Sequence, residues 1–333
     1  MPNHCTVYEP TEANLDICAR LLQEGEVVGV PTETVYGLAG NPLIEHSARK
    51  IFSVKGRPFI DPLIVHFSDV DAATAHIKTN AAVKTLAARF WPGPLTMVVN
   101  KKASIPDIVT AGLSSVAVRV PRHPIFRSLL ARLDFPLAAP SANPFGYVSP
   151  TLASHVQGTL GARIPAVLDG GPCELGIEST IIDLRDPGKP AIFRHGPITQ
   201  EALAEALGME IDDHTAGNPD HKAQAAPGLL TKHYSPRARV HLFRQGTMPG
   251  KFSEITHQQL QAVVFNQKPE FEPISSHTFW LSEDGRPDTI AHNLFELIQR
   301  LDQQGFDELY VELSVDRGIG KAINDRLHRA AAK

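Results

Sequence analysis

The segment Val27–Phe67 constrains the fold of this chain more than any other part of the sequence. It contains two short apolar stretches, Val27–Val30 and Leu63–Phe67, and each is typical of a buried strand. The first stretch ends in PTETVYG, residues 31–37, and the turn Lys55–Pro58 lies between the two. Ligands of open α/β sheets bind beyond the carboxyl ends of strands, so the hydroxyls and backbone N–H groups of PTETVYG predict a polar pocket on a rigid sheet.

The Lys55–Pro58 turn carries two cations, Lys55 and Arg57. A guanidinium held in a tight turn can bind a phosphate or carboxylate through two parallel hydrogen bonds. The alternative is that both cations belong, with Arg49 and Lys50, to the solvated face and C-terminal end of a helix, where they complement the helix dipole. The turn alone favours neither interpretation.

Three further segments bear on this question: SSVAVRVP (residues 114–121), PLAAPSANPFGYVSP (136–150) and GIESTIIDL (176–184). Together with PTETVYGL and KGRP they resemble, in the same order, the YrdC-like domain of the threonylcarbamoyl-AMP synthase family over residues 10 to about 207. The motif APGLLTKHYSP (226–236) is similar to the linker of the long, two-domain form. Several separated motifs in one order are more specific than any single one.

Length and composition agree with this resemblance. A chain of 333 residues exceeds the usual single core, which predicts two domains. The net charge of −4 argues against a broad nucleic-acid-binding surface. Cys5, Cys18 and Cys173 are scattered and predict neither a disulfide framework nor a zinc site, so a reducing compartment is the default. We find no signal peptide and no run of about 18 apolar residues, and we expect a cytoplasmic protein without membrane contact.

The hydrophobic periodicity predicts an alternation of helices and strands. Helices are predicted at Thr11–Glu24, Ile44–Val54, Ala81–Phe90 with Asn80 as N-cap, Gln200–Leu207, Asp288–Gln303 and Ile319–Ala330. Strands are predicted at Val27–Val30, Leu63–Phe67, Leu95–Asn100, Val116–Val120, Pro136–Ala139, Ala166–Leu168, Thr180–Leu184, Ala191–Arg194, Val240–Phe243, Gln261–Phe265, Thr278–Leu281 and Glu308–Leu313. The irregular alternation favours a twisted mixed open α/β sheet, as the YrdC-like resemblance also implies.

We predict three parts of the chain. Residues 1–207 form the YrdC-like domain, residues 208–238 a polar linker with the APGLLTKHYSP motif as a lid, and residues 239–333 a smaller Rossmann-like α/β domain. The dinucleotide fingerprint is absent, because Gly318–Ile323 lacks the third glycine. The C-terminal domain is therefore expected to be a support or interaction module without a nucleotide of its own.

Common catalytic templates are missing from the sequence. It contains no Walker A motif, no H-E-x-x-H and no G-x-S-x-G, and it offers no obvious covalent nucleophile. This fits a reaction that depends on positioning and on neutralising phosphate charge. The resemblance implies that L-threonine, bicarbonate or CO₂, and ATP with Mg²⁺ give threonylcarbamoyl-adenylate and pyrophosphate. Downstream tRNA threonylcarbamoyl-transfer proteins would then use the adenylate, with at most weak tRNA contact by this chain.

The resemblance also implies roles for individual residues. The L-threonine contacts would be Thr34, His66, Arg119, Ala139 and Ser179. The ATP contacts would be Lys55, Arg57, Asp61, Ser115, Ser141, Asn143, Ser149, Arg194 and Tyr234, with Lys55 and Arg57 meeting the phosphates as catalytic residues. No metal ligands are assigned, because Mg²⁺ that bridges phosphates keeps much of its water.

Several of these residues have a structural alternative. Asp61 stands where the family usually has Asn, and its carboxylate would repel phosphates unless it pairs with Arg57 or helps to hold the metal. Arg119 either reaches into the pocket or lies on the solvated face of an edge strand. Tyr234 is either part of the lid or an ordinary linker residue. Thr34, Ser141 and Asn143 could instead make local side-chain hydrogen bonds within their turns.

Two other functions share this type of domain. A non-catalytic RNA-binding or ribosome-associated module would show salt-dependent RNA affinity without ATP turnover. A carbamoyltransferase of the hydrogenase-maturation type would need zinc-finger cysteine pairs and an acylphosphatase-like segment, and the sequence has neither.

Overall fold

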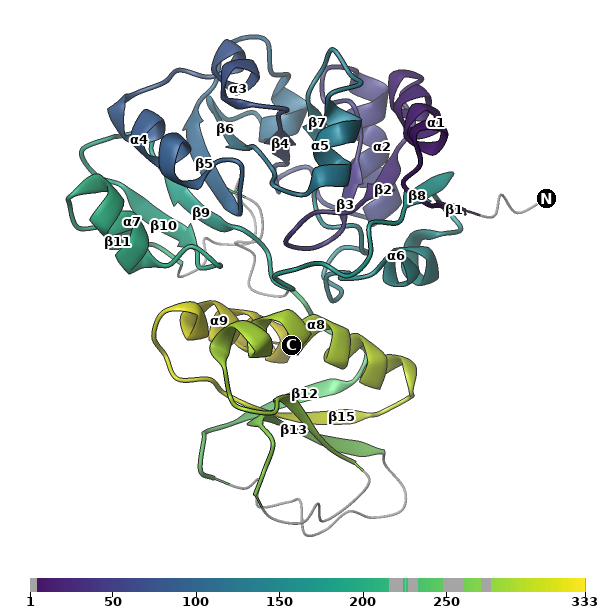
Figure 1. The fold of residues 1–333 in the computed structure, drawn as a ribbon, viewed down its shortest axis with the longest axis vertical. Coiled ribbons are helices and arrows are strands. Elements are labelled where there is room, and N and C mark those ends of the chain that lie inside the picture. The colour runs from purple at the N-terminus through teal and green to yellow at the C-terminus, as the bar shows by residue number, and fades with distance from the viewer. Residues whose placement is uncertain are drawn as a thin grey trace.

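The chain forms two α/β units stacked along its long axis (Figure 1). The computed structural model describes residues 5–215, 224, 226, 233–247, 260–270 and 277–332. No helix within these ranges has the length and apolar character needed to cross a membrane.

The larger unit is built on two mixed sheets. Their strands are β1 (Thr6–Tyr8), β2 (Val28–Val30), β3 (Gly37–Ala39), β4 (Ile64–His66), β5 (Leu95–Asn100), β6 (Ser115–Arg119), β7 (Leu137–Ala138), β8 (Ala166–Leu168), β9 (Thr180–Asp183), β10 (Ala191–Arg194) and β11 (Asp212–Asp213). One sheet has the order β1-β8-β2-β3, and the other has the order β11-β10-β9-β5-β6-β4-β7. Both contain parallel and antiparallel pairs, so the predicted mixed sheet is confirmed.

The two sheets meet at a seam between β3 and β7. Gly40 pairs with Ala138 and Gly37 with Ser141 as isolated antiparallel bridges. The backbone N–H of Leu38 also donates to the Pro140 carbonyl over 2.7 Å. The seam therefore brings PTETVYG, from the start of the chain, against the Pro-Ser-Ala-Asn-Pro turn about a hundred residues later.

Helices cover the sheets of the larger unit. They are α1 (Glu12–Gln23), α2 (Glu45–Lys55), α3 (Val70–His76), α4 (Ala81–Phe90), α5 (Pro124–Leu130), α6 (Ala153–Leu160) and α7 (Gln200–Leu207), with the 3₁₀ turn η1 (Asp107–Thr110). Asn80 caps α4 as predicted, since its side chain accepts from the Val83 N–H at 3.0 Å. Helix α2 ends at Gly56, whose φ of +64° is the left-handed conformation that glycine tolerates.

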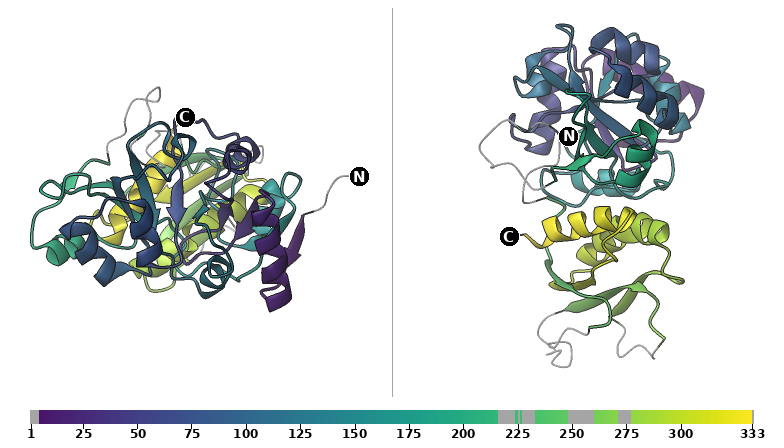
Figure 2. Two further views of the ribbon diagram at one scale, coloured as in Figure 1. Left: turned by 90° about the horizontal axis from the view of Figure 1, so that it is seen from above. Right: turned by 90° about the vertical axis from the view of Figure 1, so that its left-hand side faces the viewer.

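The smaller unit is a parallel four-stranded sheet with two helices on one face. Its strands are β12 (Arg239–Phe243), β13 (Gln261–Gln267), β14 (Thr278–Ser282) and β15 (Glu308–Glu312), in the order β12-β15-β13-β14. Helices α8 (Pro287–Gln303) and α9 (Ile319–Ala331) lie between this sheet and the larger unit (Figures 1 and 2). The elements predicted for this region are confirmed to within about two residues at each end.

The two units share an apolar core. Val35, Val148 and Ile177 of the larger unit belong to the same cluster of buried side chains as Leu294 and Phe295 of α8. The backbone at Gly176 of the larger unit also lies close to α8. A Cβ on Gly176 would be only 2.2 Å from the carbonyl oxygen of His292. The contact between the units is therefore a packed interface.

The predicted linker, residues 208–238, contains one short strand. Asp212 and Asp213 form β11, which pairs in parallel with β10. This segment follows α7 in the chain, and its backbone pairs with β10 at the end of the sheet. Most of the remaining linker, including residues 227–232 of APGLLTKHYSP, lies outside the described residues. The three-part domain boundaries remain predictions.

Candidate active site

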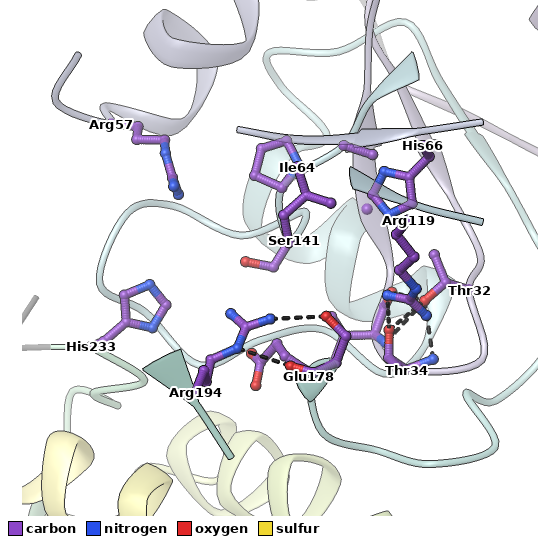
Figure 3. A pocket seen from close by; sticks show the side chains of 15 residues that line it. Thr32, Thr34, Arg57, Ile64, His66, Arg119, Ser141, Glu178, Arg194 and His233 are labelled. Carbon is purple, nitrogen blue, oxygen red and sulfur yellow. Dashed lines mark hydrogen bonds between the residues drawn. The ribbon is translucent and has the colours of Figure 1, made fainter. Parts of the chain in front are cut away.

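A small cavity lies beside the seam, where several strand ends converge (Figure 3). Strands β4 and β6 pair in parallel, so His66 and Arg119 lie side by side at the carboxyl ends of these strands. The cavity holds about 40 Å³, which is space for only a few water molecules. Its walls are Thr32, Thr34, Val35, Gly37, Arg57, Ile64, His66, Arg119, Ala139, Pro140, Ser141, Glu178, Ser179, Arg194 and His233.

Arg119 is held at one end of the cavity by three partners. Its Nη2 lies 2.8 Å from Oε1 of Glu33, its Nη1 donates to Oγ1 of Thr34 at 3.1 Å, and its Nε donates to the Gly93 carbonyl at 3.1 Å. Among the described residues only the Nε and Nη1 contacts are hydrogen bonds, so N–H donors of the guanidinium remain for an incoming carboxylate. The alternative of a solvated edge position is wrong, because β6 is an interior strand and Arg119 is buried.

Glu33 compensates the charge of Arg119. Burial alone would raise the pKa of the Glu33 carboxyl, but the attraction of the Arg119 guanidinium, together with hydrogen bonds from Arg119 and from backbone N–H groups, lowers it. Glu33 also accepts from the backbone N–H of Arg122 at 3.1 Å. The pair is therefore ionised and fixed before any ligand arrives.

His66 is a neutral imidazole. Burial, and then the nearby Arg119 charge, lowers the pKa of His66 to about 3. Its ring packs against Phe126 with centroids 5.5 Å apart, and its Nδ1 has no hydrogen-bond partner among the described residues. A neutral, unpaired ring nitrogen at the cavity wall can accept from or donate to a polar ligand.

Arg194 and Ser179 form a second polar group on the floor of the cavity. Arg194 donates from Nε to the Ser179 carbonyl and from Nη2 to its hydroxyl, both at 3.1 Å. Thr96 lies 2.8 Å from the same hydroxyl. Because β9 and β10 are antiparallel, the end of one strand and the start of the other bring Arg194 and Ser179 together.

Lys55 and Arg57 are buried rather than solvated. Arg57 pairs with Asp61 at 2.9 Å and donates to the carbonyls of Asp61 and Pro62, while Lys55 donates to the carbonyls of Ser141 and Asn143, each at 2.6 Å. Burial, and then repulsion by Arg57, holds the pKa of Lys55 well below its usual value. Of the two alternatives for the Asp61 carboxylate, pairing with Arg57 is the one present in the structure.

The helix-face alternative predicted that these cations are solvated. Of Arg49, Lys55 and Arg57, only Arg49 is solvated. Arg49 is 57% exposed and pairs with Glu45 one turn away, whereas Lys55 and Arg57 are 3% and 6% exposed. Lys55 does end α2, but its ammonium points into the structure and ties down the Pro-Ser-Ala-Asn-Pro turn.

His233 closes the cavity from the linker side. Its ring is edge-on to that of Tyr234, with centroids 4.1 Å apart, and Tyr234 stacks on Phe295 of α8 at 5.4 Å. Burial, and then repulsion by Arg57, lowers the pKa of His233 well below its usual value. Tyr234 has a φ of +61°, a strained backbone conformation for a bulky residue and one that is found mostly where function requires it.

The structure brings eight of the predicted site residues to the cavity wall: Thr34, Arg57, His66, Arg119, Ala139, Ser141, Ser179 and Arg194. The other six lie outside that wall: Lys55, Asp61, Ser115, Asn143, Ser149 and Tyr234. Asn143 bonds to the carbonyls of Pro144 and Tyr147, and Ser149 donates to Glu178. Ser115 begins β6, at the opposite end of that strand from Arg119.

Sequence reasoning missed three polar residues of the wall. Thr32 belongs to PTETVYG and its hydroxyl bonds to that of Thr34 at 2.8 Å, so the motif already contained this signal. His233 is the neighbour of the residue we chose from the linker. Glu178 lies in GIEST, where nothing local indicates that its carboxylate would face the cavity.

The cavity has two cationic ends (Figure 3). Arg119, with His66 and Thr34, lies at one end, while Arg57 and Arg194 lie towards the other, beside His233. The described residues contain no group of three His, Cys, Asp or Glu side chains that could hold a metal ion. Once enlarged, a site with these two ends would suit two anionic groups placed next to each other.

Two family models match almost the whole chain. The Sua5/YciO/YrdC model, described as telomere recombination, matches residues 20–196. The model described as threonylcarbamoyl-AMP synthase, C-terminal domain, matches residues 198–332.

Proteins with curated names and solved structures agree with these models. A threonylcarbamoyl-AMP synthase of Pyrococcus abyssi is 35% identical, over 96% of this chain and 94% of that protein, and one of Bacillus subtilis is 35% identical, over 94% and 91%. The structure of P. abyssi Sua5 complexed with L-threonine has a TM-score of 0.89 at 34% identity, and covers 98% of this chain and 97% of that one. A double-alanine variant of P. abyssi Sua5 has a TM-score of 0.87 at 33% identity, with 98% and 96% covered. Escherichia coli YciO, at 18% identity and a TM-score of 0.53, covers 58% of this chain and 96% of its own and shares the fold. The chain belongs to the threonylcarbamoyl-AMP synthase family.

Proposed function

We propose that this chain makes L-threonylcarbamoyl-adenylate from L-threonine, bicarbonate or CO₂, and ATP, and that it releases pyrophosphate. The observation that carries the proposal is the pairing of a compensated, buried Arg119 at one end of the cavity with Arg57 and Arg194 towards the other. One end suits an amino-acid carboxylate, and the other suits a polyphosphate. The relatives named threonylcarbamoyl-AMP synthase support the same reaction.

The amino acid would bind at the Arg119 end. The remaining N–H donors of Arg119 would hold the threonine carboxylate, and Thr34, Ser179 and the Ala139 region would surround the rest of the molecule. Neutral His66 adds a polar atom without adding a charge. The threonine-bound Sua5 structure of P. abyssi supports an amino-acid site in a protein of this fold.

The nucleotide would bind at the Arg57 end. The threonine amine adds to CO₂ and loses a proton, and the carbamate oxygen then attacks the α-phosphorus of ATP. A new P–O bond forms as the bond to the β-phosphate breaks, and pyrophosphate leaves. Arg57 and Arg194 would stabilise the phosphate charge, and Lys55 would hold the Ser141 turn in place while keeping one ammonium donor free of the two carbonyls.

Magnesium would enter with ATP as part of the substrate. Among the described residues, the cavity wall offers one carboxylate, that of Glu178, and this carboxylate is already paired with a guanidinium. The protein therefore supplies cations and hydroxyls around the phosphates, and Mg²⁺ would keep its water and phosphate ligands.

The cavity must enlarge before both substrates fit. The described linker residues cover it: His233 forms part of the wall, Ala226 packs in a cluster with Ile64 and Phe193, and the N–H of Gln224 donates to the Ile60 carbonyl at 2.9 Å. Displacement of this segment would uncover the sheet surface between the two ends of β6. Ser115 would then lie on the nucleotide side.

The test is pyrophosphate release by the purified full-length chain with Mg-ATP and bicarbonate, with and without L-threonine, and with the product identified by mass spectrometry. Threonine-dependent release of a threonylcarbamoyl-adenylate mass is expected. Absence of that product from folded protein that binds ATP would overturn the proposal. Downstream transfer to tRNA by other proteins can be tested separately by adding those proteins.

A point substitution tests the amino-acid site. Thr34→Val removes the hydroxyl that accepts from Arg119, and we expect the KM for threonine to rise about three- to tenfold, as for one lost hydrogen bond, with a smaller change for ATP. Thr74→Val is the matched control, because that hydroxyl lies on exposed α3 and bonds only to the Asp71 carbonyl among the contacts described. Equal effects of the two substitutions would remove Thr34 from the site.

A further inference from the structure

An arginine of the smaller unit reaches the cavity wall of the larger one. Arg326 lies on α9, has no exposed side-chain surface, and donates from Nε to Oε2 of Glu178 at 3.1 Å. Its Nη1 donates to the His195 carbonyl at 2.7 Å, and its guanidinium carbon lies 5.5 Å from the centre of the Tyr234 ring. Asp325 lies 2.9 Å from the same Nη1. One side chain therefore contacts two site-forming segments and the linker at the same time.

Glu178 is the reason why this contact matters for the site. Its carboxylate belongs to the cavity wall and lies beside Arg194 (Figure 3). Ser149 and Arg326 both donate to it. An ionised carboxylate without a cation would repel a polyphosphate, and because Glu178 is buried the solvent would screen it poorly.

The other nearby cations have different partners. Lys55 is bonded to two carbonyls, Arg57 is paired with Asp61, and Arg194 donates to Ser179. Among the ion pairs of the described residues, Arg326 supplies the guanidinium of Glu178. The guanidinium that pairs with this wall carboxylate therefore comes from the C-terminal unit, 148 positions further along the chain.

A purely structural tie between the units is the competing explanation. A buried ion pair of this kind commonly contributes little net stability compared with well-packed apolar side chains, because both ions lose their hydration. The interface already has apolar packing from Val148, Ile177 and Phe295, and a further hydrogen bond from Gln299 to the Ser149 carbonyl at 2.8 Å. Stability is thus a weak reason for an arginine at this position.

We propose that Arg326 is a positioning residue of the active site: it neutralises and orients the Glu178 carboxylate so that the ATP phosphates can bind beside Arg194. This inference rests on the proposed function for its identification of the polyphosphate. It gives the C-terminal unit a specific part in nucleotide binding, without a nucleotide site of its own.

The test is a double-mutant cycle in the full-length chain with Arg326→Met, Glu178→Gln and both together. We expect Arg326→Met to raise the KM for ATP at least tenfold, equivalent to about 1.4 kcal/mol, while the KM for threonine changes less than threefold. In the Glu178→Gln background the same substitution should change the KM for ATP less than threefold, since the cavity wall no longer carries the carboxylate that Arg326 neutralises. Arg326→Lys, which keeps the charge, should restore most of the ATP affinity.

Arg300→Met is the matched control. Arg300 lies on α8 of the same unit, is 51% exposed and pairs only with Glu296 one turn away among the contacts described. Its loss should leave the KM for ATP unchanged. If Arg326→Met raises the KM for ATP equally with and without the Glu178 carboxylate, the proposal is overturned and Arg326 is a structural tie between the units.

Direct binding separates this inference from the proposed function. The affinity for a non-hydrolysable ATP analogue, measured by calorimetry, requires no turnover. If the unsubstituted chain binds the analogue without making the adenylate, and Arg326→Met weakens that binding tenfold, the reaction assignment fails and the role of Arg326 stands. If Arg326→Met does not fold, Arg326→Gln is measured with and without Glu178→Gln, and an equal weakening of analogue binding in both backgrounds would refute the proposal.

Discussion

Removal of Arg119 should expose the cost of leaving Glu33 buried without its cation. The two side chains are 4% and 2% exposed and their charged atoms are 2.8 Å apart. Breaking such a pair by deleting one partner costs about 3–5 kcal/mol, because the remaining charge stays out of water. With an m-value near 3 kcal/mol/M, Arg119→Met should lower the urea midpoint of the larger unit by roughly 1–2 M.

Tryptophan fluorescence can follow this transition in the larger unit. The chain has two tryptophans, and Trp91 is buried in the larger unit with its indole N–H bonded to the Leu95 carbonyl. A Trp280→Phe background leaves Trp91 as the only reporter. The Arg119→Met, Glu33→Gln double variant should be more stable than the sum of the single effects predicts, since neither charge is then left alone. A loss below about 1 kcal/mol, or strict additivity, would contradict the reasoning.

The pH dependence gives an independent check with a definite sign. In the unsubstituted chain the Glu33 pKa is lowered, so its contribution to stability is present above the unfolded value near 4.3 and is lost as the pH falls below it. In Arg119→Met, burial without the cation should raise that pKa above its unfolded value. Stability should then recover on acidification, and the gap between the two proteins should narrow from pH 7 to about pH 4.

Three further predictions concern other parts of the molecule. Arg57→Ala should lower stability as well as pyrophosphate release, because it removes the ion pair of the buried Asp61 carboxylate, and addition of Asp61→Asn should recover part of the melting temperature but not the activity. The pKa of His66 is lowered to about 3, so its contribution to stability is present above pH 6.5 and is lost as the pH falls towards 3. The urea midpoint of His66→Asn should therefore depend less on pH over that range than the midpoint of the unsubstituted chain. Asn80→Ala should destabilise α4 by about 1 kcal/mol, and an unchanged melting temperature would show that the cap is dispensable.

The sequence predicted the periodic elements well and the short ones poorly. Strands β5, β8 and β10 and helix α7 have the predicted bounds, because their side chains match one buried face or a continuous apolar run. Strand β3 was missed since Gly37 and Gly40 lower its strand propensity, and tertiary pairing at the seam decides its conformation.

Two of the missed helices did have readable signals. Helix α3 begins after Asp69, whose side chain accepts from the Ala72 N–H, and α5 begins with Pro124 at its first position. Helix α6 has no such signal: no side chain caps its N-terminus, and Gly158 interrupts its apolar face. Its position follows from packing against β8, which local rules do not include.

The prediction of the candidate site divides in the same way, into residues found from motifs and residues whose role depends on tertiary contacts. Arg57, Arg119 and Ser179 were found because each lies in a motif at a strand end or a tight turn. Glu178 was missed because its significance depends on Arg326, which is distant in sequence and belongs to the other unit. Lys55 was assigned to phosphates, but the structure shows its ammonium bonded to backbone carbonyls, a contact that no sequence pattern encodes.

The order of strands in the first sheet has a consequence for synthesis on the ribosome. Strand β8 lies between β1 and β2, so Val28 and Thr6 both pair with Ala166. About 140 residues separate Val28 from Leu168, and translation of that length takes roughly 7–28 s at typical rates. During this interval the backbone edges of β1 and β2 that pair with β8 have no partner strand. We expect the nascent chain to be a substrate for chaperones until β8 has emerged.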